Sequence, residues 1–584
     1  MRNSFRFIVV ADSHIRPPDQ ETDAYPSNAL MVGRNEFVVD LCNRIDASFV
    51  VHLGDIVHPL PVEATHAESI RLAKRVYASL RHPIHFVAGN HDVGDKPNAL
   101  VAVPAVEEAN YTVYEEAWGP SFHSFDVEGC HFVIVDTQLM NTGLDREQRQ
   151  RTWLESDLGE ARMANKRIFV FSHYPPFIRN RNENEHYDNI GEPARSWLLD
   201  LLSHHDVEAM FSGHVHNFLY NRHEGTDLYV APSTGFVRPD YAELASVPPM
   251  AENGRDDPPK LGVLVVDVNA EGHDTQPVRS FGSVEADTPL PIDPDVSLRP
   301  GWESPIGVTL RQEWARVTGF PTAGLDEFNR KLVRNDAVIL ALWEARIRDI
   351  RVPLTDLAIP AIADRVSHLT GRGMRFTVVS AGVPDLRSIE IVRSNATSIH
   401  GWEIIVPPTS FTATLAFIGS TPVPDVELAI APIAPIGPSG AGLHHFVTAG
   451  FSLTDGAELA KWLEIDADRV FDSLVFRVPW DEHVGDSSQR ARTVAKESGR
   501  KVILVIDLPR AGESAVFDDD DAVADRVGDV VRAAALEPDV AVFLDGFVDH
   551  DRGYYPRHGL IDRAFNPRPA LYRLITESTA IGPL

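Results

Sequence analysis

Cysteine is almost absent from this chain of 584 residues, which contains only Cys42 and Cys130. Cys42 falls on a predicted helix and Cys130 opens a predicted strand, so we expect two small buried thiols rather than a disulfide. This distribution also excludes a metal site built from thiolates.

Long apolar runs are absent as well. No stretch of about 18 or more uncharged apolar residues occurs, which excludes an integral membrane protein. The chain opens with a few polar residues that lead directly into an apolar strand, and this leaves no room for a secretory signal peptide. We therefore expect a cytoplasmic location.

Positive charge is scarce relative to negative charge. The chain has 54 Lys and Arg against 84 Asp and Glu, which gives a formal net charge of −30. Such a charge repels polyanions and argues against long nucleic acid as a partner, although bound metal ions can still attract a small anionic ester. The sequence leaves the oligomeric state open.

Polar motifs follow five short apolar runs in the first part of the chain. The motifs are Asp12-x-His14, Gly54-Asp55, Gly89-Asn90-His91-Asp92, His173 and Gly213-His214-Val215-His216. The runs before them are rich in β-branched and aromatic residues, which is typical of buried strands, and helices are expected between them, over 34–46 and after Pro193. Because α/β sheets bind ligands beyond the carboxyl ends of their strands, these motifs can converge on one site.

These side chains are the ones that a two-metal centre for phosphoester hydrolysis needs, with a metal-activated water as the nucleophile. Asp12 and His14, two residues apart at a strand end, can bind one ion together, and the Asp55 carboxylate can bridge both. The other candidate ligands are Asn90, His173, His214 and His216. Nitrogen and oxygen ligands without sulfur suit Mn, Fe, Zn or Ni.

His91 is the candidate catalytic histidine. It follows a candidate ligand directly, so it can stand beside the metals and stabilise the transition state or protonate the leaving oxygen. Asp92 is expected to hold the ring of His91 in place. A single histidine among the 24 in this chain is more often a surface or core residue than a ligand, and only the ordered set reverses that judgement.

Together these five motifs resemble the signature of the calcineurin-like metallophosphoesterases, over roughly the first 280 residues. The resemblance implies a two-layer β sandwich flanked by helices. It also implies a division of the ligands, with Asp12, His14, Asp55 and His216 on one metal and Asp55, Asn90, His173 and His214 on the other.

Two branches of that superfamily are similar to different parts of the sequence. Gly54-Asp55-Ile56-Val57-His58, Gly89 to Gly94, Trp118-Gly119 and the stretch from His173 to Asn189 resemble a branch that contains a protein Ser/Thr phosphatase. The Asp-x-His opening resembles class III cyclic nucleotide phosphodiesterases. The substrate can therefore be a phosphomonoester, including a phosphoprotein, or a phosphodiester.

The loop from Arg179 to Glu192 follows His173 and is long enough to overhang a site at the strand ends. We expect His186, Tyr187 and Asn189 to contact substrate. The alternative is a solvated loop without a role in binding.

The second half of the chain has a different composition. We expect a phosphoesterase domain over 1–285, a Pro-rich linker over 286–305 and a second α/β domain over 306–584. Alternating apolar runs and helical stretches predict a TIM-like (β/α) barrel there. The run His558-Gly559-Leu560-Ile561-Asp562 resembles the last turn of barrel glycosidases.

Three hypotheses remain for the whole chain. The favoured one is a phosphoesterase with an accessory barrel that binds or positions substrate, for example a carbohydrate. A bifunctional enzyme that also cleaves glycosidic bonds needs two facing carboxylates, and the candidates are Asp481, Glu482, Asp507 and Asp545. The third is a metal-bearing scaffold without turnover.

Overall fold

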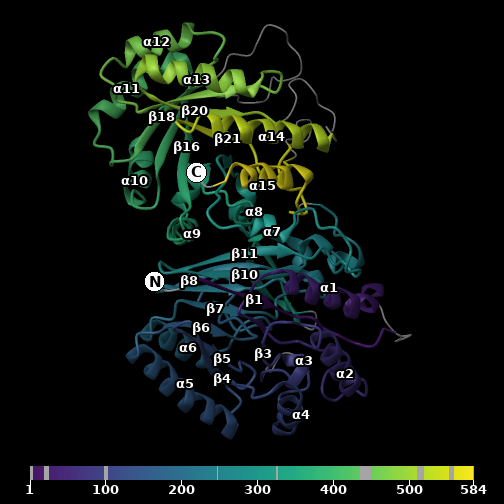
Figure 1. Ribbon diagram of the computed structural model, residues 1–584. Coiled ribbons are helices and arrows are strands. Elements are labelled where there is room, and N and C mark those ends of the chain that lie inside the picture. The colour runs from purple at the N-terminus through teal and green to yellow at the C-terminus, as the bar shows by residue number, and fades with distance from the viewer. Residues whose placement is uncertain are drawn as a thin grey trace. The chain divides into compact units, whose positions relative to one another are not determined.

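A computed structural model describes residues 4–18, 25–97, 103–245, 247–323, 326–433, 449–508, 519–550 and 558–582 (Figure 1). Contacts divide the chain into two compact units, residues 1–298 with 316–340 and residues 299–315 with 341–584. In the described ranges, no helix combines the length and the apolar character that crossing a bilayer requires. Cys42 and Cys130 are buried and form no disulfide with each other, as expected.

The first unit is built on two sheets. The five-stranded sheet has the order β11 (His273–Arg279), β10 (Gly262–Val268), β1 (Phe5–Val10), β2 (Phe49–His52) and β3 (Ile84–Phe86). The six-stranded sheet has the order β4 (His123–Val127), β5 (Cys130–Ile134), β6 (Arg167–Phe171), β7 (Ala209–Ser212), β9 (Thr226–Val230) and β8 (Leu219–His223). Strands β1, β2 and β3 are parallel to one another, as are β5, β6, β7 and β9, so the carboxyl ends within each set meet at one edge.

A layer of phenylalanine rings fills the space between the two sheets. The ring of Phe7 on β1 lies 5.6 Å from Phe132, 5.9 Å from Phe169 and 5.8 Å from Phe211, all on the six-stranded sheet. Successive side chains of a strand point to opposite faces, so Ile8 points away from this layer and packs against a helix. The two-layer sandwich that the sequence resemblance implied is confirmed.

Helices cover the outer faces of both sheets, and the figure shows α1 beside β1 and α5 and α6 beside β5 and β6 (Figure 1). Helix α1 buries Phe37, Val38 and Leu41 against the five-stranded sheet. The helices of this unit are α1 (Met31–Arg44), α2 (His66–Tyr77), α3 (Asn90–Val93), α4 (Glu108–Trp118), α5 (Asp145–Met163), α6 (Ala194–His204) and α7 (Pro294–Ser297). The helices expected over 34–46 and after Pro193 correspond to α1 and α6.

The second unit contains a closed barrel of eight parallel strands, which confirms the predicted (β/α) barrel. Its strands are β12 (Gly307–Thr309), β15 (Asp349–Pro353), β16 (Arg375–Ala381), β17 (Gly401–Val406), β18 (Glu427–Pro432), β19 (Ser473–Val478), β20 (Lys501–Ile506) and β21 (Val540–Leu544). The helices along this part of the chain are α8 (Ala337–Glu344), α9 (Pro360–Thr370), α10 (Leu386–Ser394), α11 (Phe411–Ser420), α12 (Ala457–Ile465), α13 (Val484–Ser498), α14 (Asp520–Leu536) and α15 (Pro569–Ile581).

The segment expected to be a linker is more ordered than its proline content indicated. It contains the one-turn helix α7, and Leu290 and Leu298 pack into the apolar cluster under α1. The compact units also place the hairpin β13 (Val317–Ala323) and β14 (Asp326–Arg334) in the first unit, although the hairpin follows the segment in sequence. The domain limits drawn from the sequence remain a prediction.

Candidate metal centre

Hydrogen bonds between backbone groups bring the first two motifs together. Strands β1 and β2 are parallel, and their pairing continues beyond the strand ends, where the Asp12 N–H donates to the Gly54 carbonyl at 3.2 Å. The His14 N–H donates to the Asp55 carbonyl at 3.0 Å. Asp12, His14 and Asp55 therefore lie at the same edge because their strands end there.

Two glycines allow the motif loops to approach closely. A Cβ atom on Gly89 would lie 2.1 Å from the Asp55 backbone nitrogen and 2.3 Å from its carboxylate oxygen. Gly54 has a φ of +95°, and a Cβ there would meet the His173 ring at 2.8 Å. Any side chain at Gly89 would displace the Asp55 carboxylate, so glycine is required beside it.

Contacts through Asp12 and His173 join the two sheets at the same place. The Asp12 carboxylate accepts the His214 backbone N–H at 3.1 Å, and the His173 Nδ1 donates to the Leu53 carbonyl, directly after β2, at 2.8 Å. The loops after β6 and β7 thus face the loops after β1 and β2. The convergence expected from the five motifs is present in the structure.

Two groups of buried side chains in this region have their ligand atoms within 4.8 Å of one another, and Asp55 belongs to both. One consists of Asp12, His14, Asp55 and His216, and the other of Asp55, His173 and His214. The acids and histidines of each group are the ones that the resemblance assigned to one metal. Asn90 is not a member of the second group because these groups include only acids, histidines and cysteines, and its side chain is an amide.

In the first group, ring nitrogens and carboxylate oxygens face one another. The Nε2 atoms of His14 and His216 are 3.0 Å apart, and the His216 Nε2 lies 3.4 Å from the Asp12 carboxylate. The His216 Nδ1 contacts the Phe236 carbonyl at 2.9 Å, which fixes Nδ1 as the protonated nitrogen and leaves the Nε2 lone pair toward the group. Lone pairs that converge in this way suit a cation.

The second group has the same character. The His173 Nδ1 donates to the Leu53 carbonyl at 2.8 Å, so its Nε2 faces the Asn90 carbonyl oxygen at 3.0 Å. The His214 Nδ1 lies 3.1 Å from the same Asn90 oxygen. Asp55 lies 3.4 Å from the His173 Nε2. Asn90 therefore faces the second group with its oxygen, as a ligand would.

Charge in this region is balanced between Asp55 and the histidines. Burial raises the pKa of Asp55, but the neighbouring His173, His91 and His14 outweigh burial and hold that pKa well below its ordinary value. Burial lowers the pKa of His173, but Asp55 outweighs burial and raises it to about 9. Burial holds the pKa of His14 and of His214 well below the ordinary value, so both rings are neutral and able to ligate.

Several candidate ligands have a left-handed backbone conformation, which is rare outside glycine. The φ angles are 54° at Asp12, 45° at His14, 53° at Asp55, 68° at His214 and 58° at His216. Each such residue costs of the order of 1–3 kcal/mol, and this strain concentrates at functional sites. Five of them around one centre indicate a function that requires this geometry.

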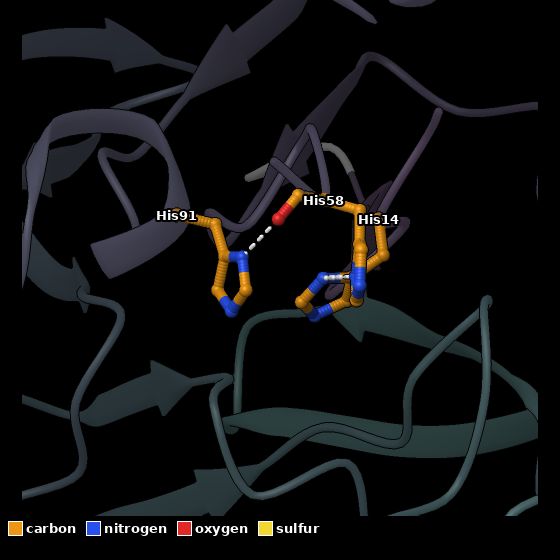
Figure 2. A group of neighbouring side chains, drawn as sticks. All are labelled: His14, His58 and His91. Carbon is orange, nitrogen blue, oxygen red and sulfur yellow. Dashed lines mark hydrogen bonds between the residues drawn. The ribbon is translucent and has the colours of Figure 1, made fainter. Parts of the chain in front are cut away.

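Figure 2 shows His91 beside His14 and His58, with one ring nitrogen toward the His58 backbone carbonyl. The Nδ1 atom of His91 donates to that carbonyl, so Nε2 is the nitrogen left for chemistry. The Asp92 carboxylate instead accepts backbone N–H groups, at 2.9 Å from Gly89 and 3.1 Å from Ile56. The expectation that Asp92 holds the His91 ring is therefore wrong, since Asp92 fixes the motif loops.

His58 is a member of the site that the sequence did not single out. Its Nδ1 lies 3.1 Å from the His14 Nδ1, and His14, His58 and His91 form a third group of close ring nitrogens. The sequence feature that could have identified His58 is its position three residues after Asp55, in a run that resembles a phosphatase branch.

The loop after His173 presents one of its three expected substrate residues to the site. The Asn189 side chain contacts the Glu183 carboxylate at 2.9 Å and the His186 N–H at 3.0 Å, and the His186 ring lies 3.2 Å from Glu183. These two side chains therefore serve the fold of the loop. Only the Tyr187 hydroxyl, which accepts from the Asn90 amide at 3.3 Å, faces the candidate ligands.

The carboxylates proposed for a glycosidase lie after strands β19, β20 and β21 of the barrel. Arg477 donates to Asp507 at 2.9 Å and to Asp545 at 3.4 Å, and Arg311 donates to Asp545 at 2.9 Å. Glycoside hydrolysis needs two carboxylates that face the substrate, whereas arginines engage these two. The expected glycosidase pair gains no support from this arrangement.

Comparison with known proteins agrees with the geometry of the centre. The family model of the calcineurin-like phosphoesterases matches residues 5–218, the segment that carries all five motifs. The match covers less than half of the chain, and it shows that this segment is similar to that family. The first compact unit is called the phosphoesterase unit from here on.

Curated relatives of the phosphoesterase unit are phosphatases by name. The chain is 29% identical over 209 residues to the serine/threonine-protein phosphatase CPPED1 of Homo sapiens, which covers 34% of this chain and 64% of the relative. It is 28% identical over 149 residues to purple acid phosphatase 22 of Arabidopsis thaliana, which covers 24% of this chain and 31% of that relative. The chain thus spans less than two thirds of the length of these relatives.

Solved structures similar to the chain include two phosphatases. A purple acid phosphatase from yellow lupin, Lupinus luteus, has a TM-score of 0.34 at 16% identity, covering 49% of this chain and 53% of that one. A dimetal phosphatase from Danio rerio has a TM-score of 0.33 at 14% identity, covering 47% of this chain and 96% of that one.

Proposed function

We propose that the phosphoesterase unit hydrolyses phosphate esters with two divalent or trivalent metal ions held by the loops that follow its strands. The observation that carries this proposal is the pair of buried ligand groups that share Asp55. Oxygen and nitrogen donors without sulfur suit Mn, Fe, Zn or Ni. Two such ions supply charge neutralisation at the phosphate and an activated water.

The side chains of the chain itself then have distinct tasks. Asp12, His14, Asp55 and His216 hold one ion, and Asp55, Asn90, His173 and His214 hold the other. His91 is fixed through Nδ1 by the His58 carbonyl, and its Nε2 donates a proton to the leaving oxygen or stabilises the negative charge of the transition state.

We further propose a phosphomonoester on a serine or threonine side chain as the substrate class, because the CPPED1 relatives are named serine/threonine-protein phosphatases. A phosphodiester is the outcome that the Asp-x-His opening of the sequence favours. Tyr187 is the residue of the substrate loop proposed to contact the ester, and Tyr187→Phe should raise KM at least as much as it lowers kcat.

The test is a substrate panel with the Mn-loaded chain. It contains an aryl phosphate monoester, an aryl phosphate diester, phosphoserine and phosphothreonine peptides and a cyclic nucleotide. Turnover of the monoester and the peptides, abolished by Asp55→Asn, supports the proposal. Turnover of diesters alone moves the assignment to a phosphodiesterase, and no turnover of any ester contradicts the proposed function.

A further inference from the structure

The hairpin β13–β14 has a place in the phosphoesterase unit that its position in the chain does not indicate. Along the sequence it lies between the first barrel strand, β12, and helix α8. The contacts nevertheless group residues 316–340 with residues 1–298. Between the last strand of the two-sheet sandwich and the hairpin, the chain passes through β12, which belongs to the second unit. The phosphoesterase unit is therefore discontinuous in sequence.

Apolar packing connects the hairpin to the part of the unit that carries candidate ligands. Phe320 of β13 and Val333 of β14 belong to one buried cluster with Ile178, Val215 and Tyr241. Val215 is the residue between His214 and His216, and the rings of Phe320 and Tyr241 are 5.3 Å apart. The hairpin therefore belongs to the same buried cluster as the turn that carries two of the candidate ligands.

A buried ion network makes the second contact. The Lys331 side chain of β14 is fully buried, and its Nζ forms an ion pair with Asp188 and donates to Asp240 at 2.8 Å. Asp188 is also fully buried; it pairs with Arg238 and accepts the Tyr241 hydroxyl at 2.9 Å. Two cations thus balance two carboxylates, and removing Lys331 leaves an excess negative charge in a buried place.

This network lies against His214. The Asp188 carboxylate is 3.8 Å from the His214 Nε2, and the carbonyl of Tyr187 accepts from that same nitrogen at 3.2 Å. With Nε2 occupied by this carbonyl, the ring presents Nδ1 to Asn90 and His173. Groups that hydrogen-bond to the non-ligating nitrogen of a metal-binding histidine orient its ring and affect both metal affinity and activity.

We propose that the hairpin completes the phosphoesterase centre, with Lys331 as a positioning residue that acts through Asp188 on His214. This inference rests on the proposed function, since it assigns His214 to a metal. Its consequence is that the centre depends on residues that follow the Pro-rich segment in sequence, so the phosphoesterase is incomplete without residues 316–340.

The test uses the full chain with Lys331→Met, Lys331→Arg and Asp188→Asn. Arg330→Met is the matched control, because Arg330 is the exposed neighbour on the same strand and points to the opposite face. Mn affinity is measured by equilibrium dialysis, and kcat and KM are measured on an aryl phosphate. Lys331→Met should weaken binding of one Mn ion about 10- to 100-fold and lower kcat more than it raises KM. Lys331→Arg should retain most of both, and Arg330→Met should match the wild type.

A double variant tests whether Lys331 acts through Asp188. In the Asp188→Asn background, Lys331→Met should change Mn affinity less than about twofold further, because the Asp188 charge through which Lys331 is proposed to act is already gone. An equal effect in both backgrounds overturns the proposal, as does a Lys331→Met protein with the Mn affinity of Arg330→Met. If Lys331→Met does not fold, wild-type Mn affinity in Asp188→Asn overturns it.

The two proposals fail in different ways. Wild-type protein that binds two Mn ions but hydrolyses no ester contradicts the proposed function, while the Mn affinities of the variants still decide the role of the hairpin. Wild-type protein that hydrolyses esters, with Lys331→Met equal to the control, contradicts the role of the hairpin alone.

Discussion

Replacement of the shared carboxylate by an amide, Asp55→Asn, separates a two-metal centre from other uses of these residues. Asn keeps the shape and the oxygen that accepts the His91 N–H at 2.9 Å, so the local fold is retained. It removes the charge that lies 3.5 Å from the His14 Nε2 and 3.4 Å from the His173 Nε2. Since Asp55 belongs to both ligand groups, both ions should bind more weakly.

The size of the effect follows from binding arithmetic. Two ions, each at about 100 times its Kd, stabilise the folded unit by roughly 5 kcal/mol in total. If the substitution weakens each site about 100-fold, the remaining stabilisation is about 0.8 kcal/mol. At roughly 2 °C per kcal/mol, Mn should raise the Tm of the wild type by about 10 °C and that of Asp55→Asn by about 2 °C.

The assay is a thermal melt with and without Mn, together with aryl phosphate kinetics. A loss of about 4 kcal/mol of transition-state stabilisation corresponds to about a thousandfold fall in kcat/KM. Asp200→Asn is the control, since Asp200 is exposed on α6. The reasoning is refuted if Asp55→Asn shows the wild-type Mn-induced shift or keeps kcat/KM within threefold of the control.

Three further predictions concern His91, Gly89 and His173. His91→Gln should lower kcat about 10²- to 10³-fold while two Mn ions remain bound, measured by kinetics and metal analysis, and loss of an ion would show that His91 is a ligand instead. Gly89→Ala, whose Cβ would meet the Asp55 carboxylate at 2.3 Å, should abolish Mn binding, whereas Gly272→Ala, with no atom within 4 Å, should not. Burial lowers the pKa of His173, but Asp55 outweighs burial and raises it to about 9 in the metal-free protein, so the ring is protonated at pH 7. Mn binding at pH 7 should therefore release a proton. Calorimetry in two buffers of different ionisation enthalpy checks this, and unchanged heats contradict it. The pKa of His173 is higher in the folded protein than in the unfolded protein. In the metal-free protein, the stabilisation that protonated His173 provides is therefore complete below about pH 6.5 and is lost as the pH rises through 9.

The sequence predicts that the motif side chains lie close together, because each motif follows an apolar strand. Parallel strands deliver the residues after them to one edge, so Asp12 and Asp55 become neighbours without any further information. The predicted role of Asp92 is wrong for a related reason: adjacency in sequence suggested a contact with His91, whereas its buried carboxylate binds the N–H groups of two loops.

Other parts of the site depend on contacts that no local pattern reports. Lys331 is 143 residues from Asp188, and neither residue belongs to a motif. His186 and Asn189 have the polarity of substrate-binding residues, but the same polar groups stabilise a loop when they find partners within it. Composition cannot distinguish these two uses, because both require the same donors and acceptors.

The most direct test of the account is the metal content and turnover of the wild-type chain, measured on the same sample. After reconstitution with Mn and removal of free ion, we expect about two ions per chain and hydrolysis of an aryl phosphate. A chelator should abolish that activity, and added Mn should restore it. Undiminished hydrolysis by protein stripped of all transition metal, or no ion retained after reconstitution, would contradict the account.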